Sequence, residues 1–195
     1  MWGGPRPPAA VLPFRMSLFL ATLLPGLVLT LLGVLLLLHS PVVVSALSAL
    51  PRSPVGALVL FGGGVLWFLV RVAQMGAADR ILGDSNVPWV VGFGALGVLA
   101  FRYVPDFLAV RGLSILLLLS ATPLLGASFM RYAPQDYPLK VLSYLAIVLA
   151  LYLAAVPYRL RDFLAWLFAR PGRARGFGAA LLATGILLNL VAFTY

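Results

Sequence analysis

The chain of 195 residues has no cysteine and no glutamate, and its only histidine is His39. The absence of thiols excludes disulfides, cysteine-ligated iron–sulfur clusters, thiol nucleophiles and most structural zinc sites. A single histidine with no Cys or Glu near it does not form a recognisable metal site. We therefore expect the protein to hold no metal and no other cofactor.

Motifs of familiar enzymes are also missing. A hydrolase triad of His39, an aspartate and a serine has no nucleophile-elbow motif to support it. The glycine-rich stretch 92–97 lacks the strand–turn–helix context of a dinucleotide site, and the glycines at 62–64 lack the Lys-Ser/Thr of a phosphate loop. We therefore expect no catalytic residues and no enzyme activity.

Charged residues are scarce, and long apolar runs take their place. Only 10% of the residues are charged and 63% are hydrophobic, whereas soluble domains have about a quarter charged and about half apolar. The run over 17–38 has the length of a membrane-spanning helix. It is also longer than the hydrophobic region of a signal peptide, so we expect 16–38 to remain as a permanent helix.

The charge that is present is strongly basic, with 14 Lys and Arg against five Asp and a net charge of +9. Outside 159–175 the basic residues lie one or two at each junction between apolar runs, which is typical of membrane-protein loops and does not indicate a nucleic-acid partner. The predicted partner is a lipid bilayer. The excess of Arg over Lys, with abundant Ala, Gly and Pro, favours a bacterial inner membrane.

The apolar runs predict an all-α polytopic integral membrane helix bundle with five or six hydrophobic helices. The expected segments are 16–38, 55–70, 87–101, 107–130, 139–157 and 177–193. No linker between them is long enough for a soluble domain. We therefore expect a single membrane-embedded domain over 16–195, preceded by a disordered tail over 1–15.

Segment 87–101 decides whether the chain crosses the membrane five or six times. It is short, and it contains Pro88 and three glycines, a composition that favours a re-entrant or buried segment. Six crossings place eight basic residues on one side and six on the other, whereas five crossings place eleven against three. The positive-inside rule therefore favours five crossings.

Residues 158–170 differ from the other segments because aromatic residues alternate with arginines there. A basic, aromatic segment of this kind can lie flat in the headgroup layer. The alternative is that the preceding helix continues and ends at Pro171. We favour the interfacial helix, whose basic neighbours are Arg159, Arg161, Arg170, Arg173 and Arg175.

Most other charges suit helix boundaries. The stretches 101–112 and 130–142 both contain Arg-Tyr-x-Pro followed by Asp, and these residue types favour helix ends at a bilayer surface. Arg71 is the better functional candidate because apolar residues follow it, and Asp79 or Asp84 is its expected ion-pair partner. Snorkelling of Arg71 to the interface is the alternative that we prefer.

Small residues inside the apolar runs predict close helix packing. The expected packing positions are Gly62, Gly63 and Gly64 in one segment and Gly176, Ala180 and Thr184 in another. Asn189 is strongly polar for its depth in the last segment, and we expect it to bond to another helix rather than to line a pathway.

These observations favour a structural or accessory subunit of a membrane complex, with other membrane subunits or a second copy of the chain as partner. One alternative is a small transporter or channel for a neutral or apolar solute. The other is a lipid-acting enzyme that holds a phosphate headgroup with Arg159, Arg161 and the turn at 131–140.

Overall fold

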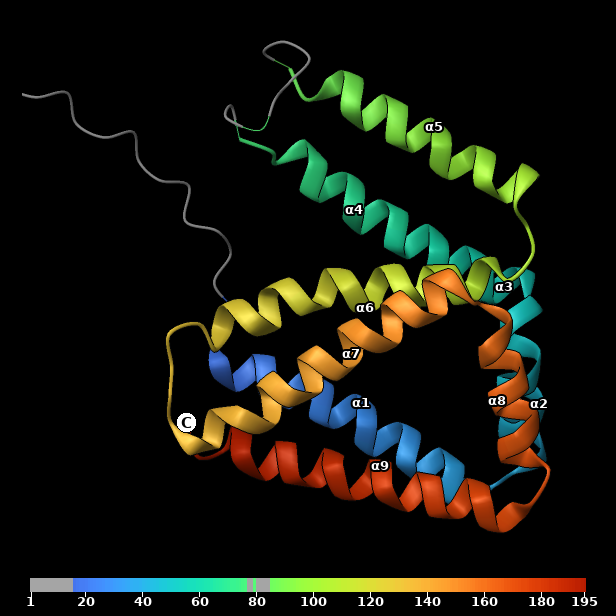
Figure 1. Ribbon diagram of the computed structural model, residues 1–195, viewed down its shortest axis with the longest axis vertical. Helices are drawn as coiled ribbons and strands as arrows, with labels where there is room; N and C mark the ends of the chain where they lie inside the picture. Colours follow the sequence, from blue (N-terminus) through green and yellow to red (C-terminus); the bar gives the residue numbers. More distant parts are fainter. Residues whose placement is uncertain (1–15, 77–78, 80–84) are drawn as a thin grey trace, which may run out of the picture.

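The computed structural model describes residues 16–76, 79 and 85–195, and these residues form helices joined by turns (Figure 1). The elements are α1 (Leu18–Leu38), α2 (Pro41–Ala49), η1 (Leu50–Arg52), α3 (Pro54–Gly56), η2 (Ala57–Gly62), α4 (Gly63–Ala73), α5 (Val87–Tyr103), α6 (Leu108–Ala127), η4 (Pro134–Asp136), α7 (Tyr137–Ala155), α8 (Tyr158–Phe168) and α9 (Pro171–Ala192). The predicted all-α fold is confirmed. The expected tail over 1–15 lies outside the described residues.

Five helical stretches are long and apolar enough to cross a membrane. They are Leu18–Leu38, Pro54–Ala73, Leu108–Ala127, Pro134–Ala155 and Pro171–Ala192. The second stretch is continuous from α3 through η2 to α4, and its middle part, η2, is a π-helix. The protein is thus a multi-pass membrane protein, as its apolar runs predicted.

Helix α5 has 17 residues and is shorter than these five stretches. It packs antiparallel to the 54–73 stretch, because Phe101 stacks edge-on against Phe61 and Phe93 against Phe68, with ring centroids 5.4 and 5.2 Å apart. Its length of about 25 Å carries the chain from one end of the bundle to the other. The five stretches of spanning length agree with the five-crossing interpretation, and a sixth crossing by α5 is a prediction that its pairing with α4 adds.

Helices α2 and α8 lie together across one end of the bundle (Figure 1). Helix α7 ends at Ala155, and α8 begins only after the non-helical Val156 and Pro157. Because α8 buries Leu164 and Leu167 and exposes its arginines, it is a separate amphipathic helix and not a continuation of α7. The apparent linker at 40–54 contains α2, which begins at Pro41 with Ser40 as its N-cap.

The first and last long helices, α1 and α9, form the most extensive helix pair, and glycines bring their backbones together. A Cβ atom on Gly33 would lie 2.6 Å from the backbone nitrogen of Leu182, and one on Gly185 would lie 2.5 Å from that of Thr30. Gly26 and Gly178 face the partner helix in the same way. This contact requires residues without a side chain.

The expected packing positions on α9 face outward instead. Gly176, Ala180 and Thr184 are exposed, and the buried face consists of Ala174, Gly178, Gly185, Leu188 and Ala192. The predicted stripe was displaced by about half a turn, because small residues occur on several faces of α9 and the sequence does not indicate which one meets a partner. In the other predicted set Gly64 packs on Ile115 of α6, Gly62 only just reaches its neighbours and Gly63 has nothing within 4 Å.

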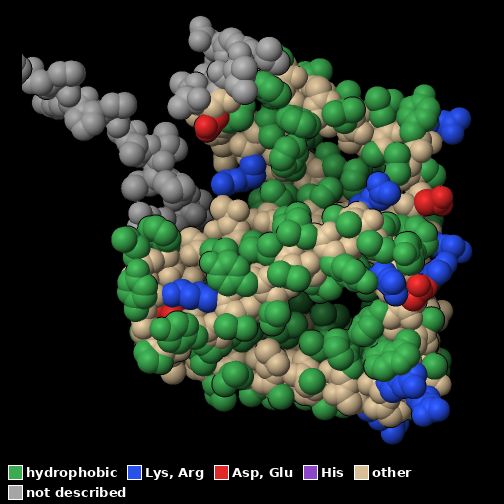
Figure 2. All heavy atoms as spheres, in the orientation of Figure 1, with side chains coloured by type: hydrophobic (Ala, Val, Ile, Leu, Met, Phe, Trp, Pro, Cys, Tyr) green, Lys and Arg blue, Asp and Glu red, His purple; other side chains and the backbone are tan. Residues whose placement is uncertain are grey.

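Basic side chains gather at the end of the bundle where α2 and α8 lie, which we call the α8 end (Figure 2). Helix bounds place eight arginines there: Arg52, Arg102, Arg111, Arg159, Arg161, Arg170, Arg173 and Arg175. The described basic residues at the opposite end are Arg71, Arg131 and Lys140. We call this the Arg131 end, and it also contains Tyr195.

The α1–α9 contact predicts that Gly178→Ala destabilises the protein. The added Cβ would lie 3.0 Å from the carbonyl oxygen of Gly33 and 3.1 Å from the nitrogen of Leu37, so the two helices must separate. We expect a loss of about 1–3 kcal/mol, measured as thermal or denaturant unfolding in detergent. Gly176→Ala on the same helix is the control, since a Cβ there meets nothing within 4 Å. Equal losses in both variants would contradict this packing.

The path of α5 predicts that Ser85 and Asp106 lie on opposite sides of the membrane. Because the chain has no cysteine, Ser85→Cys and Asp106→Cys each introduce one thiol, at exposed positions just beyond the two ends of α5. A membrane-impermeant maleimide applied to intact cells is expected to label one variant only. Labelling of both variants in intact cells would contradict a crossing by α5. So would a result in which both variants are labelled only after the cells are permeabilised.

Candidate functional site

A groove with a volume of about 790 Å³ lies at the Arg131 end. It is lined by residues of α1, α4 and α6 and of the turn after α6. Its walls are mostly apolar, with Leu24, Trp67, Leu119 and Phe129 among the lining residues. Arg71 and Arg131 also line it, and we call it the Arg71 groove.

Arg71 lies in the last turn of α4 and is exposed. Its expected partner Asp79 is also exposed, and among the described residues no carboxylate is within ion-pair distance of Arg71. Asp84, the other expected partner, lies outside the described residues. Arg71 therefore lies at a helix end, where snorkelling remains the prediction, and it also lines the wall of a cavity, which the sequence did not indicate.

Arg131 follows α6 and forms an ion pair with Asp136. Its Nε donates to Oδ2 of Asp136 over 3.3 Å, and Asp136 is completely buried while the arginine side chain is 51% exposed. The other carboxylate oxygen, Oδ1, has no hydrogen-bond partner among the described residues. Buried charges are expensive without partners, so Arg131 is the main compensation for the charge of Asp136.

Thr22 and Tyr195 complete the surroundings of Asp136. Thr22 is buried in the first turns of α1 and donates to the carbonyl of Leu18, while the Tyr195 hydroxyl donates to the carbonyl of Gln135 over 2.9 Å. Burial raises the pKa of the Tyr195 phenol above its usual value of 10.0, and the Asp136 carboxylate adds to this shift. The Tyr195 hydroxyl thus ties the last helix to the turn before α7.

The sequence indicated Arg131 and Asp136 only as residues of a turn at a helix boundary. The motif Arg-Tyr-x-Pro-x-Asp at 131–136 indicated a helix boundary, and the short helix η4 lies there, directly before α7. Nothing in the residue types showed that Asp136 would be buried beneath α1 and Tyr195. Its position five residues after an arginine was the available signal for an ion pair.

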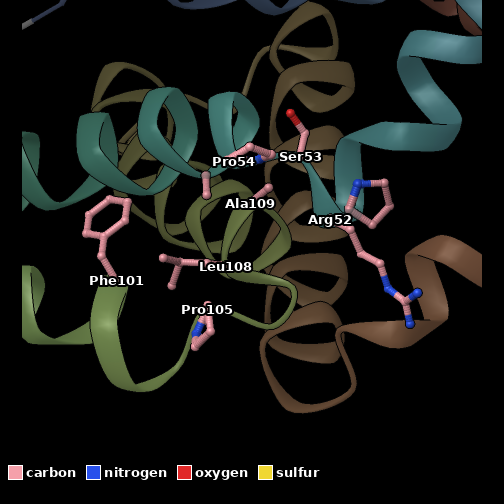
Figure 3. Close-up of a pocket in the computed structure, with 9 residues that line it drawn as sticks. Arg52, Ser53, Pro54, Phe101, Pro105, Leu108 and Ala109 are labelled. Carbon is pink, nitrogen blue, oxygen red and sulfur yellow. The ribbon is translucent and has the colours of Figure 1, made fainter.

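A smaller cavity of about 200 Å³ lies at the α8 end, between the turn before α3 and the start of α6 (Figure 3). Its polar groups are already engaged. The Ser53 hydroxyl accepts from the backbone N–H of Gly56, and the guanidinium of Arg52 lies 5.3 Å from the ring centre of Phe107 and points away from Pro105 and Leu108. The remaining lining is proline and apolar side chains, which gives this cavity no chemistry of its own.

The predicted interfacial arginines mark the α8 end. Arg161 pairs with the neighbouring Asp162 over 2.7 Å, and Arg173 lies 4.7 Å from the ring centre of Trp166. Arg159, Arg170 and Arg175 are exposed. Aromatic and basic side chains alternate across this surface, which is the arrangement that favours the headgroup layer. None of these arginines lines the smaller cavity, where Arg52 is the only basic residue among the described lining residues.

Asn189 donates from Nδ2 to the Thr30 hydroxyl over 3.1 Å, so it joins α9 to α1. Its Oδ1 is buried without a hydrogen-bond partner among the described residues and faces Gly26. Asn189 does not line the Arg71 groove, so the structure places it in helix packing and not on that cavity.

No family model matches the chain, and neither a curated protein nor a solved structure shows significant similarity to it. Within residues 16–76, 79 and 85–195, no three metal-ligating side chains of His, Cys, Asp or Glu come together. Chemically, the described part of the chain thus offers two arginines in an apolar groove and one buried carboxylate.

The buried position of Asp136 predicts an asymmetric response to mutation. Arg131→Ala leaves a buried carboxylate without its cation, and we expect it to lower the free energy of unfolding by about 2 kcal/mol. Asp136→Asn in the Arg131→Ala background should recover part of this loss, because the amide carries no charge. Thermal unfolding of the wild type, both single variants and the double variant in one detergent measures the difference. A double variant that is less stable than Arg131→Ala would contradict the proposed compensation.

Proposed function

We propose that this protein is a non-catalytic accessory subunit of a membrane complex in the bacterial inner membrane. The polar side chains within its spans support this role, because their hydrogen bonds are made within or between the helices of the bundle. The hydroxyls of Thr22, Ser114 and Ser143 donate to carbonyls four residues earlier in their own helices, and Asn189 bonds to Thr30.

The charged residues of the described spans all lie close to span ends. Each of them lies within the first two turns or the last turn of its span: Arg71, Arg111, Asp136, Lys140, Arg173 and Arg175. Transport pathways and proton relays generally place ionisable groups deeper, at broken helices near the midplane. This distribution supports a scaffold over a carrier of ions or charged solutes.

The observation that carries the proposal is the open face of α5. This helix packs on α4, and of its 17 residues only Gly97 is buried. On the other face Val91, Leu96 and Leu99 are exposed, and a Cβ on Gly92 would meet nothing within 4 Å. The glycines that allow close approach between α1 and α9 thus have a counterpart in Gly92 of α5, which no described helix of this chain contacts. We propose that a helix of another subunit, or of a second copy, packs there.

The charge difference between the two ends sets the proposed orientation. Eight arginines lie at the α8 end and three described basic residues lie at the Arg131 end. The positive-inside rule then favours a cytoplasmic α8 end, and the full-chain count of eight against six for six crossings has the same sign with a smaller difference. Helices α2 and α8 would cover the cytoplasmic side of the bundle at headgroup level.

The transporter and the lipid-acting enzyme rank below the accessory subunit. A transporter would use the kinks that Pro25 in α1 and Pro123 in α6 supply, but each of the two cavities described above lies at one end of the bundle. The enzyme would need a general base or nucleophile, and Asp136 is buried beneath its ion pair with Arg131.

Gly92→Leu tests the proposal directly. The variant fills the open face of α5 without a clash inside the chain, so the protein should fold and insert normally. After solubilisation in mild detergent we expect wild-type protein to elute with a stoichiometric partner chain or as a dimer, and Gly92→Leu to hold that partner about tenfold more weakly, which corresponds to about 1.4 kcal/mol.

Gly63→Leu is the matched control, because Gly63 is likewise open but lies on α4. We expect this variant to retain the complex. A monodisperse wild-type monomer without a partner would overturn the proposal, and so would equal loss of the complex in both variants.

A further inference from the structure

The Arg71 groove carries chemistry that a scaffold does not require. Its walls expose apolar and aromatic surface, including Leu24 and Trp67, and its two charged lining residues are both arginines. No carboxylate is among the described residues that line it. A volume of about 790 Å³ lies within the range of small-molecule sites, roughly 300–1,000 Å³. The occupant that matches this lining is an amphiphile with an anionic head.

The position of the groove places that head at the membrane surface. Arg71 is in the last turn of the 54–73 span, and Arg131 follows the 108–127 span by four residues. Both arginines therefore lie at headgroup depth on the same side of the bilayer. Leu119 lies further inside its span, so the apolar part of the groove extends toward the acyl chains.

Within the described residues, the terminal nitrogens of both guanidinium groups are unengaged. Arg71 makes no ion pair with a described residue, and Arg131 uses its Nε for Asp136 while its terminal nitrogens make no hydrogen bond among the described residues. A guanidinium binds a phosphate through two parallel hydrogen bonds, and it does so best where water is partly excluded. Asp136 is completely buried behind Arg131 and holds that side chain in place.

Helix α6 adds uncharged polar groups next to the arginines. Pro123 has no N–H and leaves the carbonyl of Leu119 without its usual helical donor, and both residues line the groove together with Thr122. The freed carbonyl and the Thr122 hydroxyl thus make part of the groove wall polar below the level of the arginines. The α8 end lacks this combination, since its cavity has about 200 Å³ and its arginine points outward.

We propose that the Arg71 groove binds one anionic glycerophospholipid, with the phosphate between Arg71 and Arg131 and an acyl chain along Leu24, Trp67 and Leu119. This site is independent of the α5 face that carries the proposed function. The two can therefore fail separately, because the groove is lined by α1, α4 and α6 and not by α5.

Trp67 provides a local probe, because it lies four residues before Arg71 on the same face of α4. In the full chain, Trp2, Trp89 and Trp166 are replaced by Phe so that Trp67 is the only tryptophan. This protein is reconstituted in phosphatidylcholine vesicles that contain one part in ten of phosphatidylglycerol brominated near the top of its acyl chain. Parallel vesicles contain the same amount of brominated phosphatidylcholine. Bromine quenches tryptophan fluorescence on contact, so quenching reports the lipid in the groove.

We expect brominated phosphatidylglycerol to quench Trp67 more strongly than brominated phosphatidylcholine does. Each arginine should raise the binding constant of phosphatidylglycerol relative to phosphatidylcholine by about fivefold or more. Arg71→Gln should reduce this preference about fivefold. Arg102→Gln, an exposed arginine of the last turn of α5 at the α8 end, is the matched control and should retain it.

Two results would overturn the proposal. Equal quenching by both lipids, or an undiminished preference in Arg71→Gln, would show that the groove does not select an anionic head. Loss of the preference when inorganic phosphate is added at constant ionic strength, with potassium chloride as the comparison, would assign the arginines to a free anion instead of a lipid. Circular dichroism of each variant confirms that it is folded before the quenching is compared.

Discussion

The structure depends on the close approach of α1 and α9. Lipid tails are as apolar as leucine, so burial of apolar surface does not drive helices together in a bilayer, and packing and hydrogen bonds must do so. Gly26, Gly33, Gly178 and Gly185 let the two backbones meet, and the Asn189–Thr30 bond joins them where the approach is closest. Near the Arg131 end this pair supports Tyr195, which covers the turn that holds Asp136.

Helix α6 connects this pair to the rest of the protein, because it contacts α1, α4 and α7. At Gly112 its backbone meets the π-helical segment η2 at Phe61, where a side chain would collide. A π-helix widens the turn locally, and the wider turn coincides with this contact. The Arg71 groove is lined from the same three-helix neighbourhood of α1, α4 and α6. Helix α6 thus serves both helix packing and the proposed lipid site. It packs tightly at Gly112, toward the α8 end, and lines the groove toward the Arg131 end.

Composition and apolar runs were sufficient to predict the helices and the membrane, because both follow from short-range properties of the chain. Small residues lie on several faces of α9, so their presence alone did not show which face packs. The matching seven-residue separations of Gly26 from Gly33 and of Gly178 from Gly185 are the signal in the sequence that fits the observed face. The path of α5 depends on its pairing with α4, which no local pattern encodes. The groove was missed for the same reason, since Arg71 and Arg131 are 60 positions apart and meet only through tertiary structure.

The pairing of the first and last long helices has a consequence for how the protein is made. Asn189 and Thr30 are separated by 159 positions, so α1 enters the membrane long before its partner is synthesised. During that time its glycine face and the Thr30 hydroxyl are exposed to lipid, or to whatever insertion factor holds the nascent chain. The bundle closes only when α9 is released, which makes the last helix the one that commits the whole chain to its native arrangement.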